Sequence, residues 1–350
     1  MSVNAAAEAG KFTLQHLTLS INKAKTAKRV LAQLGIFEEK GIQTQTADFE
    51  FKDGKLMLVA QKNRGEKGDK LEKTARDIKT LRAVHLPISG EIMADALTDV
   101  RKFGAEYDNG DSGERWDEVV NEETTRMAQS LELTLEMHRM GALSGVVKDA
   151  SGDTIVNLYT LFGLNAADAI DELDFNLPKG ARNQISAAVR NSKKHQAGVA
   201  TEEYVSLCSA SFMDGLLEDA GFAKAYERQD SGKAFREEVR IKGIEWNGVF
   251  WVEHTETYPN GDLMIPEGEA RLIPIGNPGL FVTRFCPADY AETVNTVGLP
   301  LYAAAKMKDF NKGVDLEGQS NPINVCTSPL AVRQLKLKAV APVAASAKAK

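Results

Sequence analysis

One long helical segment constrains this chain more than any other feature of its sequence. A capping region, Asp111–Gly113, precedes Glu114, and no Pro or Gly follows until Gly141. The pattern predicts a helix over about 114–140, a rod on the order of 40 Å long at ~1.5 Å per residue. Apolar residues recur in two stripes at helical spacing, so we expect neighbouring elements to cover both flanks. The stripes are Trp116, Val120, Met127, Leu131 and Leu135, and Val119, Leu133, Met137 and Met140.

The sequence before this helix does not predict a hydrophobic core of its own. Residues 1–40 are a basic amphipathic segment, which fits an N-terminal arm better than a core element. Asp53-Gly54 predicts a tight hairpin turn between two strand-like runs, and a polar, basic stretch over 62–79 follows it. A second long strand is predicted to end at Pro87. We therefore expect an extended two-stranded excursion with a polar tip, which needs a neighbour to hold it.

The residues after the helix alternate strand and helix signals. A small hairpin is predicted over 146–156, helix or loop over 166–197, and a strand at 204–207. Asn247-Gly248 is the preferred type I′ turn and predicts a hairpin over 239–252. Late strands are expected at 268–285, 314–325 and 330–335, before an Ala-, Pro- and Lys-rich tail over 339–350 that should be flexible. The layout predicts an α+β fold.

Composition and charge exclude several classes of protein. Hydrophobic residues make up 43% of the 350, and charged residues 26%, as in ordinary globular chains. No apolar run approaches the ~18 residues of a membrane span, and the N-terminus lacks an apolar signal core, so we expect neither membrane association nor export. A net charge of -6 disfavours a dedicated nucleic-acid binder. The three cysteines, Cys208, Cys286 and Cys326, lie too far apart to indicate a disulfide framework or a zinc module.

No motif for a cofactor or metal withstands inspection. The glycines of 65–70 lack the spacing and the Ser or Thr of a phosphate-binding loop, so a solvated tip is the better interpretation. The alternation Asp149, Ser151, Asp153 resembles a calcium loop, but Gly152 is misplaced and Thr160 stands where the closing Glu belongs, so we predict a plain turn. The five histidines form no metal-binding pattern, and His138 on the long helix is expected to be a packed core residue.

The segment 207–211 deserves comparison with a nucleophile elbow, because it places Cys208 and Ser211 between a strand and a helix. It lacks the flanking glycines that permit the strained turn of such a motif. We interpret Cys208 as a buried strand residue and Ser211 as a helix cap. No catalytic residue, cofactor or metal ligand is predicted.

Several segments, taken in their order along the chain, resemble the lambda-type (E family) major capsid proteins of tailed double-stranded DNA bacteriophages. One looks like the family's passage from a strand into the long spine helix, and others resemble the end of that helix and the hairpin after it. The segments are 91–97 with 100–104, 133–136, 140–147, 157–163, 208–214 and 320–323.

This resemblance implies the shell fold named after phage HK97 and a division of the chain into its parts. An N-terminal arm would take 1–40 and an extended β-hairpin, the E-loop, 41–90. A peripheral domain would take 91–185 and 315–338, with the spine helix at about 114–140. An axial domain would take 186–314, and a flexible tail 339–350.

The resemblance further implies a structural protein that assembles into pentamers and hexamers of an icosahedral head, within the host cytoplasm. Implied partners are other copies, a scaffolding protein, a portal and a decoration protein, with packaged DNA nearby but not bound by sequence. Basic residues of the E-loop are expected to contact neighbouring subunits without covalent cross-links. They are Lys62, Arg64, Lys67, Lys70, Lys73 and Arg76.

Two alternatives stay open at this point. An encapsulin-like compartment shell would enclose a protein cargo in place of DNA. A cytosolic enzyme with an unrecognised α+β fold would need a polar pocket with convergent titratable groups.

Overall fold

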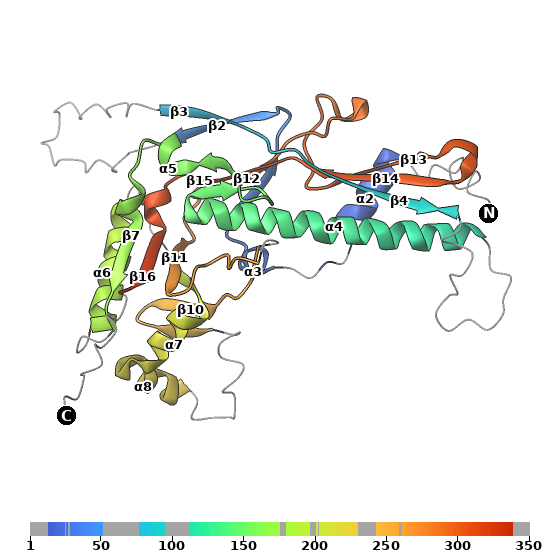
Figure 1. The fold of residues 1–350 in the computed structure, drawn as a ribbon. Helices are drawn as coiled ribbons and strands as arrows, with labels where there is room; N and C mark the ends of the chain where they lie inside the picture. The colour runs from blue at the N-terminus through green and yellow to red at the C-terminus, as the bar shows by residue number, and fades with distance from the viewer. Residues whose placement is uncertain are drawn as a thin grey trace, which may run out of the picture. The chain divides into compact units, whose positions relative to one another are not determined.

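A computed structural model describes residues 13–24, 26, 29–51, 77–94, 112–175, 180–196, 201, 203–229, 243–258 and 261–338. These residues fall into two compact units (Figure 1). The first unit holds the described residues within 1–50, 77–140 and 279–327, and the second holds residue 51 and those within 141–278 and 328–338. Helices and strands are mixed throughout, which confirms the predicted α+β class.

The predicted long helix is α4 (Ser112–Ser144), 33 residues long. The helix was predicted to end before Gly141, but it continues for one more turn, to Ser144. A Cβ at Gly141 would lie 2.8 Å from the Val146 oxygen and 2.9 Å from the Val147 Cα, so glycine here lets the next strand approach the helix. The helix ends where Gly145 adopts a φ of 81°, a left-handed conformation that suits glycine.

The first unit is built on a three-stranded antiparallel sheet that packs against α4. The strand order is β13 (Tyr302–Met307), β14 (Gly313–Ser320) and β4 (Leu86–Met93). Figure 1 shows α4 running along one face of this sheet. The apolar core between them contains Ile92, Val314 and Leu316 from the sheet and Trp116, Val120, Met127, Ala128 and Leu131 from the helix.

The prediction that a strand ends at Pro87 is wrong. Two strands occupy this region, β3 (Asp77–Arg82) and β4, and Pro87 lies inside β4, opposite Gln319. β4 is an edge strand of its sheet, where a residue without an N–H group is tolerated.

Three elements of the predicted N-terminal arm pack against the same chain, so this segment contributes to the core. In α2 (Leu14–Lys23), Leu17 and Ile21 are 3% and 1% exposed and join the core of the first unit. The short α3 (Val30–Leu34) buries Leu31. β1 (Glu38–Gly41) pairs in parallel with β12 (Phe281–Phe285), which pairs with β15 (Pro322–Cys326). Leucine and isoleucine at helical spacing in this segment gave it an apolar face that the basic residues obscured.

The two-stranded excursion is confirmed at its base, where β2 (Thr46–Phe51) pairs with β3. The predicted hairpin turn at Asp53-Gly54 and the strand predicted over 56–60 lie outside the described residues.

The second unit is built on a six-stranded mixed sheet with helices packed against it. Its core includes Phe212 and Trp251, whose rings stack with centroids 6.2 Å apart. The order is β7 (Ile170–Leu173), β16 (Arg333–Leu337), β11 (Glu269–Ile275), β8 (Glu203–Cys208), β10 (Val249–Glu253) and β9 (Ile244–Trp246). The helices are α6 (Gly180–Lys194), α7 (Ala210–Glu218) and α8 (Ala220–Gln229).

Two predicted hairpins are confirmed in this unit. The turn Asn247-Gly248 joins β9 to β10, and both residues have positive φ, 55° and 73°, as a type I′ turn requires. β5 (Val146–Lys148) pairs with β6 (Thr154–Asn157). The helical or loop interpretation of 166–197 missed β7, which follows a short 3₁₀ turn, η2 (Ala166–Ala169).

Short elements complete the two units. They are α5 (Leu158–Leu161), η3 (Ala291–Thr293), η4 (Asp309–Asn311) and η5 (Pro329–Ala331).

The boundaries of the two compact units differ from the boundaries predicted for the peripheral and axial domains. β13, predicted within the axial range, pairs with β14 and belongs to the first unit. β16, predicted within the peripheral range, pairs with β11 and belongs to the second. Strand pairing between distant segments sets these boundaries, and a sequence pattern does not show which strands pair.

Candidate functional site

The six basic residues predicted to contact neighbouring subunits, Lys62 to Arg76, all lie outside the described residues. Their role therefore stays a prediction. The described residues offer a different candidate, an open face on the sheet of the first unit.

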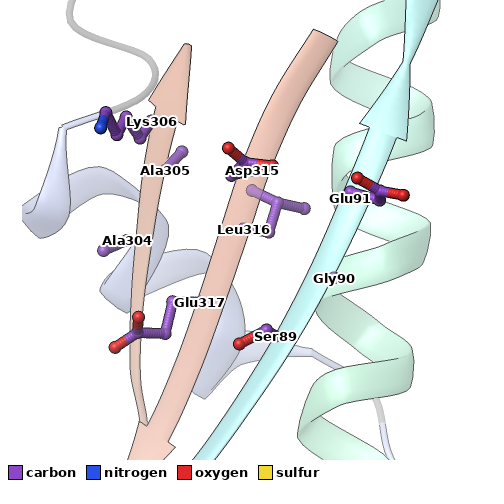
Figure 2. A pocket seen from close by; sticks show the side chains of 9 residues that line it. All are labelled: Ser89, Gly90, Glu91, Ala304, Ala305, Lys306, Asp315, Leu316 and Glu317. Atoms are coloured by element: carbon purple, nitrogen blue, oxygen red, sulfur yellow. The ribbon is translucent and has the colours of Figure 1, made fainter. Parts of the chain in front are cut away.

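The open face is the side of β13, β14 and β4 that points away from α4 (Figure 2). Side chains alternate along these strands, so that apolar residues face the helix and polar residues face outward. One cross-strand row on the outer side is Lys306, Asp315 and Glu91. The next is Ala304, Glu317 and Ser89.

Small residues make this face hollow. Ser89 and Ala304 sit beside Glu317 in the second row, and a shallow pocket of about 490 Å³ extends over both rows. Each outer residue of the strand centres, Ser89, Glu91, Asp315 and Glu317, is exposed. A hollow floored by small side chains and rimmed by charged ones has the form of a contact surface.

The charges on the open face are largely matched. The Lys308 ammonium lies 2.5 Å from a Glu91 oxygen and 3.1 Å from an Asp315 oxygen, and these hydrogen bonds raise the pKa of Lys308. The Tyr290 hydroxyl donates to Glu317 at 3.1 Å, and burial raises the pKa of Tyr290 above its ordinary value. Such pairs fix the side chains in place and leave few groups ready for proton transfer.

A second hollow, of about 830 Å³, lies in the second unit and has several charged residues in its lining. Arg271 and Lys336 each lie 2.8 Å from a Glu269 oxygen, and Arg271 also donates to Ser144. Burial raises the pKa of Glu269, but the contacts with Lys336 and Arg271 outweigh it and hold that pKa below its ordinary value. Glu269 is thus paired with both Arg271 and Lys336, which is the arrangement of a structural ion-pair network.

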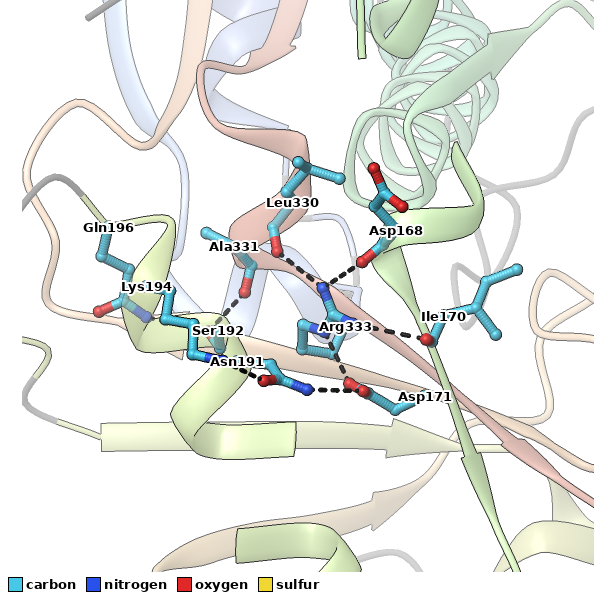
Figure 3. A network of polar contacts seen from close by, with 10 residues as sticks. All are labelled: Asp168, Ile170, Asp171, Asn191, Ser192, Lys194, Gln196, Leu330, Ala331 and Arg333. Atoms are coloured by element: carbon cyan, nitrogen blue, oxygen red, sulfur yellow. Dashed lines mark hydrogen bonds and ion pairs between the residues drawn. The ribbon is translucent and has the colours of Figure 1, made fainter. Parts of the chain in front are cut away.

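A third polar cluster, centred on Arg333, joins three elements of the second unit (Figure 3). The buried guanidinium donates to an Asp171 oxygen at 2.7 Å and to the Asp168 carbonyl at 2.6 Å. Asn191 of α6 donates to the other Asp171 oxygen at 3.0 Å. The Ser192 hydroxyl donates to the Ala331 carbonyl at 2.5 Å. This cluster ties α6 and β7 to β16, and sequence reasoning missed it, although an arginine inside a strand-like apolar run was a visible signal.

The two nucleophile-type residues of 207–211 differ in burial, because Cys208 is buried and Ser211 is exposed. Cys208 is fully buried, and burial raises the pKa of its thiol to about 12, so it stays protonated. The prediction that Ser211 caps the following helix is wrong. Ser209 caps α7 and accepts a hydrogen bond from the Phe212 amide, whereas the Ser211 hydroxyl donates to Glu267. The helix begins one residue after Ser209, which places the cap there.

The predicted plain turn at 149–153 is confirmed. One Asp149 oxygen accepts hydrogen bonds from the Ser151 and Asp153 amides, both at 2.9 Å, and Gly152 has a φ of 91°. His138 is buried in α4, as predicted. Within the described part of the chain, no group of three or more metal-ligating side chains occurs, and no helix there has the length and hydropathy to cross a membrane.

Sequence comparison identifies relatives over nearly the whole chain. A model of the family described as phage major capsid protein E matches residues 13–337. The major capsid protein of Pseudomonas phage KPP10 is 24% identical over an alignment of 322 positions, with 85% of this chain and 89% of that protein covered. The major capsid protein of Salmonella phage Felix O1 is 21% identical over a gapped alignment of 365 positions, with 92% of this chain and 95% of that protein covered.

Solved structures support the same fold. A protein assigned as the capsid protein of an Escherichia coli CFT073 prophage has a TM-score of 0.59 at 12% identity, covering 93% of this chain and 99% of that one. The mature capsid of bacteriophage PhiM1 has a TM-score of 0.50 at 13% identity, covering 87% and 86%. These likenesses confirm the predicted HK97-type capsid fold.

The family match also decides between the readings that the sequence left open. The matched relatives are structural shell proteins of phage virions, so neither the enzyme nor the encapsulin-like alternative is supported. The ion pairs of Lys308 and of Glu269 beside the two hollows agree with a structural role. This chain belongs to the phage major capsid protein E family.

Proposed function

We propose that copies of this chain associate into pentamers and hexamers, which close into an icosahedral head around double-stranded phage DNA. The family match over residues 13–337 carries the proposal. Head-to-tail contacts between identical subunits generate rings when the rotation closes. Assembly takes place in the host cytoplasm with a scaffolding protein and a portal, and a decoration protein is a further partner. The net charge of -6 supports a shell that holds DNA without gripping it.

We further propose that the open face of β13, β14 and β4 contacts a neighbouring subunit. The supporting observation is the hollow over Ser89 and Ala304, which lies on a sheet face that no described element covers. The predicted division into arm, E-loop, peripheral domain and axial domain is kept as a proposal. The first unit contains most of the proposed spine helix α4, and the second contains most of the residues proposed for the axial domain.

A Ser89→Arg variant tests the open face. An arginine there would fill the hollow and add a charge, so we expect shells in the wild-type preparation and only small oligomers or monomers in the variant. Negative-stain electron microscopy and sedimentation velocity read the outcome. Ser130→Arg is the matched control, because it makes the same change at an exposed position of α4. Shells in both variants would contradict the contact, and no shell from wild-type protein under any scaffold or salt condition would contradict the shell proposal itself.

The basic E-loop residues are proposed as non-covalent contacts with neighbouring copies: Lys62, Arg64, Lys67, Lys70, Lys73 and Arg76. A Lys67→Gln, Lys70→Gln double variant should raise the protein concentration needed for assembly and weaken its dependence on salt. The matched control is Lys193→Gln with Lys194→Gln, in the last turn of α6. Equal assembly of both double variants would contradict a role for the loop lysines.

A further inference from the structure

The sheet of the first unit has an open edge at β13, and a helix covers that edge in an unusual way. Among the residues that the structure describes, β13 pairs only with β14, so its other side carries backbone groups with no strand partner there. Edge strands of this kind invite pairing with another chain. The helix that lies on this edge is α2, which shares an apolar core with the sheet.

Two side chains of α2 take the place of a neighbouring strand. The Asn22 amide donates to the Leu301 carbonyl at 2.7 Å, and its oxygen accepts from the Leu301 amide at 3.3 Å. The Thr18 hydroxyl accepts from the Ala303 amide at 3.3 Å and lies 3.5 Å from the Ala303 carbonyl, to which it donates. Each side chain thus exchanges two hydrogen bonds with one strand residue, which is the pattern of a hydrogen-bonded pair in an antiparallel sheet.

The spacing of the two elements makes this match possible. Thr18 and Asn22 are four residues apart on a helix, which rises about 6 Å over that distance. Ala303 lies in β13 and Leu301 directly precedes that strand, and residues two apart along extended chain are about 6.6 Å apart on the same edge. Asn22 also donates to the Thr18 carbonyl at 2.7 Å, so its amide is held in position by the helix itself.

The covered edge is suited to pairing with an identical edge. β13 has the sequence Tyr-Ala-Ala-Ala-Lys-Met, whose three small side chains present little steric barrier to a second strand. Two copies of one strand can pair antiparallel about a two-fold axis, because such an interface is self-complementary. A protein that gathers many copies of itself meets that partner at high local concentration.

We propose that α2 guards the edge of β13, and that Thr18 and Asn22 keep two copies of this chain from pairing through that strand. The guard acts in the free subunit, where it prevents association that competes with ordered assembly. It is a property of this chain's own contacts and goes beyond the shell function proposed above.

The test removes the four hydrogen bonds while it keeps the apolar packing of α2. In the double variant Thr18→Val, Asn22→Leu, hydrogen exchange at the Leu301 and Ala303 amides should become at least about tenfold faster, since both lose their acceptors. Sedimentation velocity should show new, concentration-dependent association, and electron microscopy should show irregular particles rather than closed shells. Ser20→Ala is the matched control, because Ser20 lies on the same helix but donates to Asn121 of α4.

Two results would overturn the proposal. Unchanged exchange at Leu301 and Ala303 would show that the side chains do not protect the edge. Faster hydrogen exchange at these amides without new association between copies would show that Thr18 and Asn22 do not prevent pairing through β13. Should circular dichroism show that the double variant is unfolded, Thr18→Val alone decides the first point, because it should speed exchange at Ala303 and leave Leu301 unchanged. A synthetic peptide of residues 301–307 should bind the double variant and not the wild type.

Discussion

The two sheets of this protein bury their residues differently, and the difference separates a folding role from a contact role. In β8, the consecutive residues Tyr204 to Cys208 are all buried, so both faces of the six-stranded sheet are covered at its centre. In β14, buried Val314 and Leu316 alternate with exposed Asp315 and Glu317, so one face is covered and the other is open. Substitutions in the six-stranded sheet should therefore destabilise the fold, whereas the three-stranded sheet has one exposed face that a partner can contact.

The largest effect is expected at the centre of the six-stranded sheet. Trp251 is fully buried, stacks on Phe212 and donates from its indole to the Trp246 carbonyl at 3.1 Å. Trp251→Ala should lower the free energy of unfolding by about 3–5 kcal/mol, because it removes a large apolar side chain and leaves a cavity. Urea unfolding followed by circular dichroism measures the change. A loss below about 1 kcal/mol would mean that this core collapses to fill the space.

A somewhat smaller loss is expected when the buried ion pair of the same unit is broken. Arg333→Met leaves Asp171 without its charged partner, which should cost about 3 kcal/mol in the free energy of unfolding. Lys336→Ala is the control, because its side chain is partly exposed and Glu269 keeps Arg271 as a partner, so it should cost less than about 1 kcal/mol. Equal losses for the two variants would show that burial does not distinguish these pairs.

Two neighbouring residues of β14 test the two faces of the smaller sheet directly. Leu316→Ala should cost about 2–4 kcal/mol in the free energy of unfolding, because Leu316 packs in the core with α4. Glu317→Gln, one residue on and facing outward, should change it by no more than about 0.5 kcal/mol. Urea unfolding under conditions that keep both variants dissociated makes the comparison. A large loss for the Glu317 variant would mean that the outer face contributes to folding.

The smallest effect is expected in the pH dependence of the free energy of unfolding, through a buried histidine next to the six-stranded sheet. His254 follows β10, is 2% exposed, and neither of its ring nitrogens has a hydrogen-bond partner among the described residues. Burial lowers the pKa of His254 below 6.5, more than nearby Glu256 raises it. As the pH falls below about 6.5, the histidine of the unfolded chain takes up a proton while His254 in the native state does not. The native state therefore loses stability relative to the unfolded chain.

A His254→Leu variant isolates this contribution. The stability advantage of the wild type over the variant should shrink as the pH falls from about 7.5 to 5.5, because only the wild type carries the histidine. Urea unfolding at several pH values measures it. A difference that stays constant over this range would contradict a lowered pKa for His254 in the native state.

Local patterns predicted several elements of the fold. The helix α4 could be predicted because its cap, its helical spacing and the absence of proline act within a few residues of one another. The turn at Asn247-Gly248 could be predicted because few other residues adopt positive φ at both positions. The end of α4 could not, since Gly141 is needed for close packing against Val146 and Gly145 is the residue that stops the helix.

The candidate site was less accessible from the sequence. Late strands were predicted near 314–325, but the alternation of Val314 to Glu317 did not show that β4 and β13 would extend the same open face. The lysines and arginines of 62–76 remain a prediction, because they lie outside the described residues.

By itself, the sequence determined the α+β class, the long helix, the tight hairpins and the family, because each depends on residues close together or on an order of segments. Only the tertiary structure decided that α2 docks on β13 and that Arg333 meets Asp171. These partners are separated by 285 residues from Thr18 to Ala303 and by 162 from Asp171 to Arg333. Contacts across such distances form only when strand pairing brings the segments together, and no local pattern specifies that pairing.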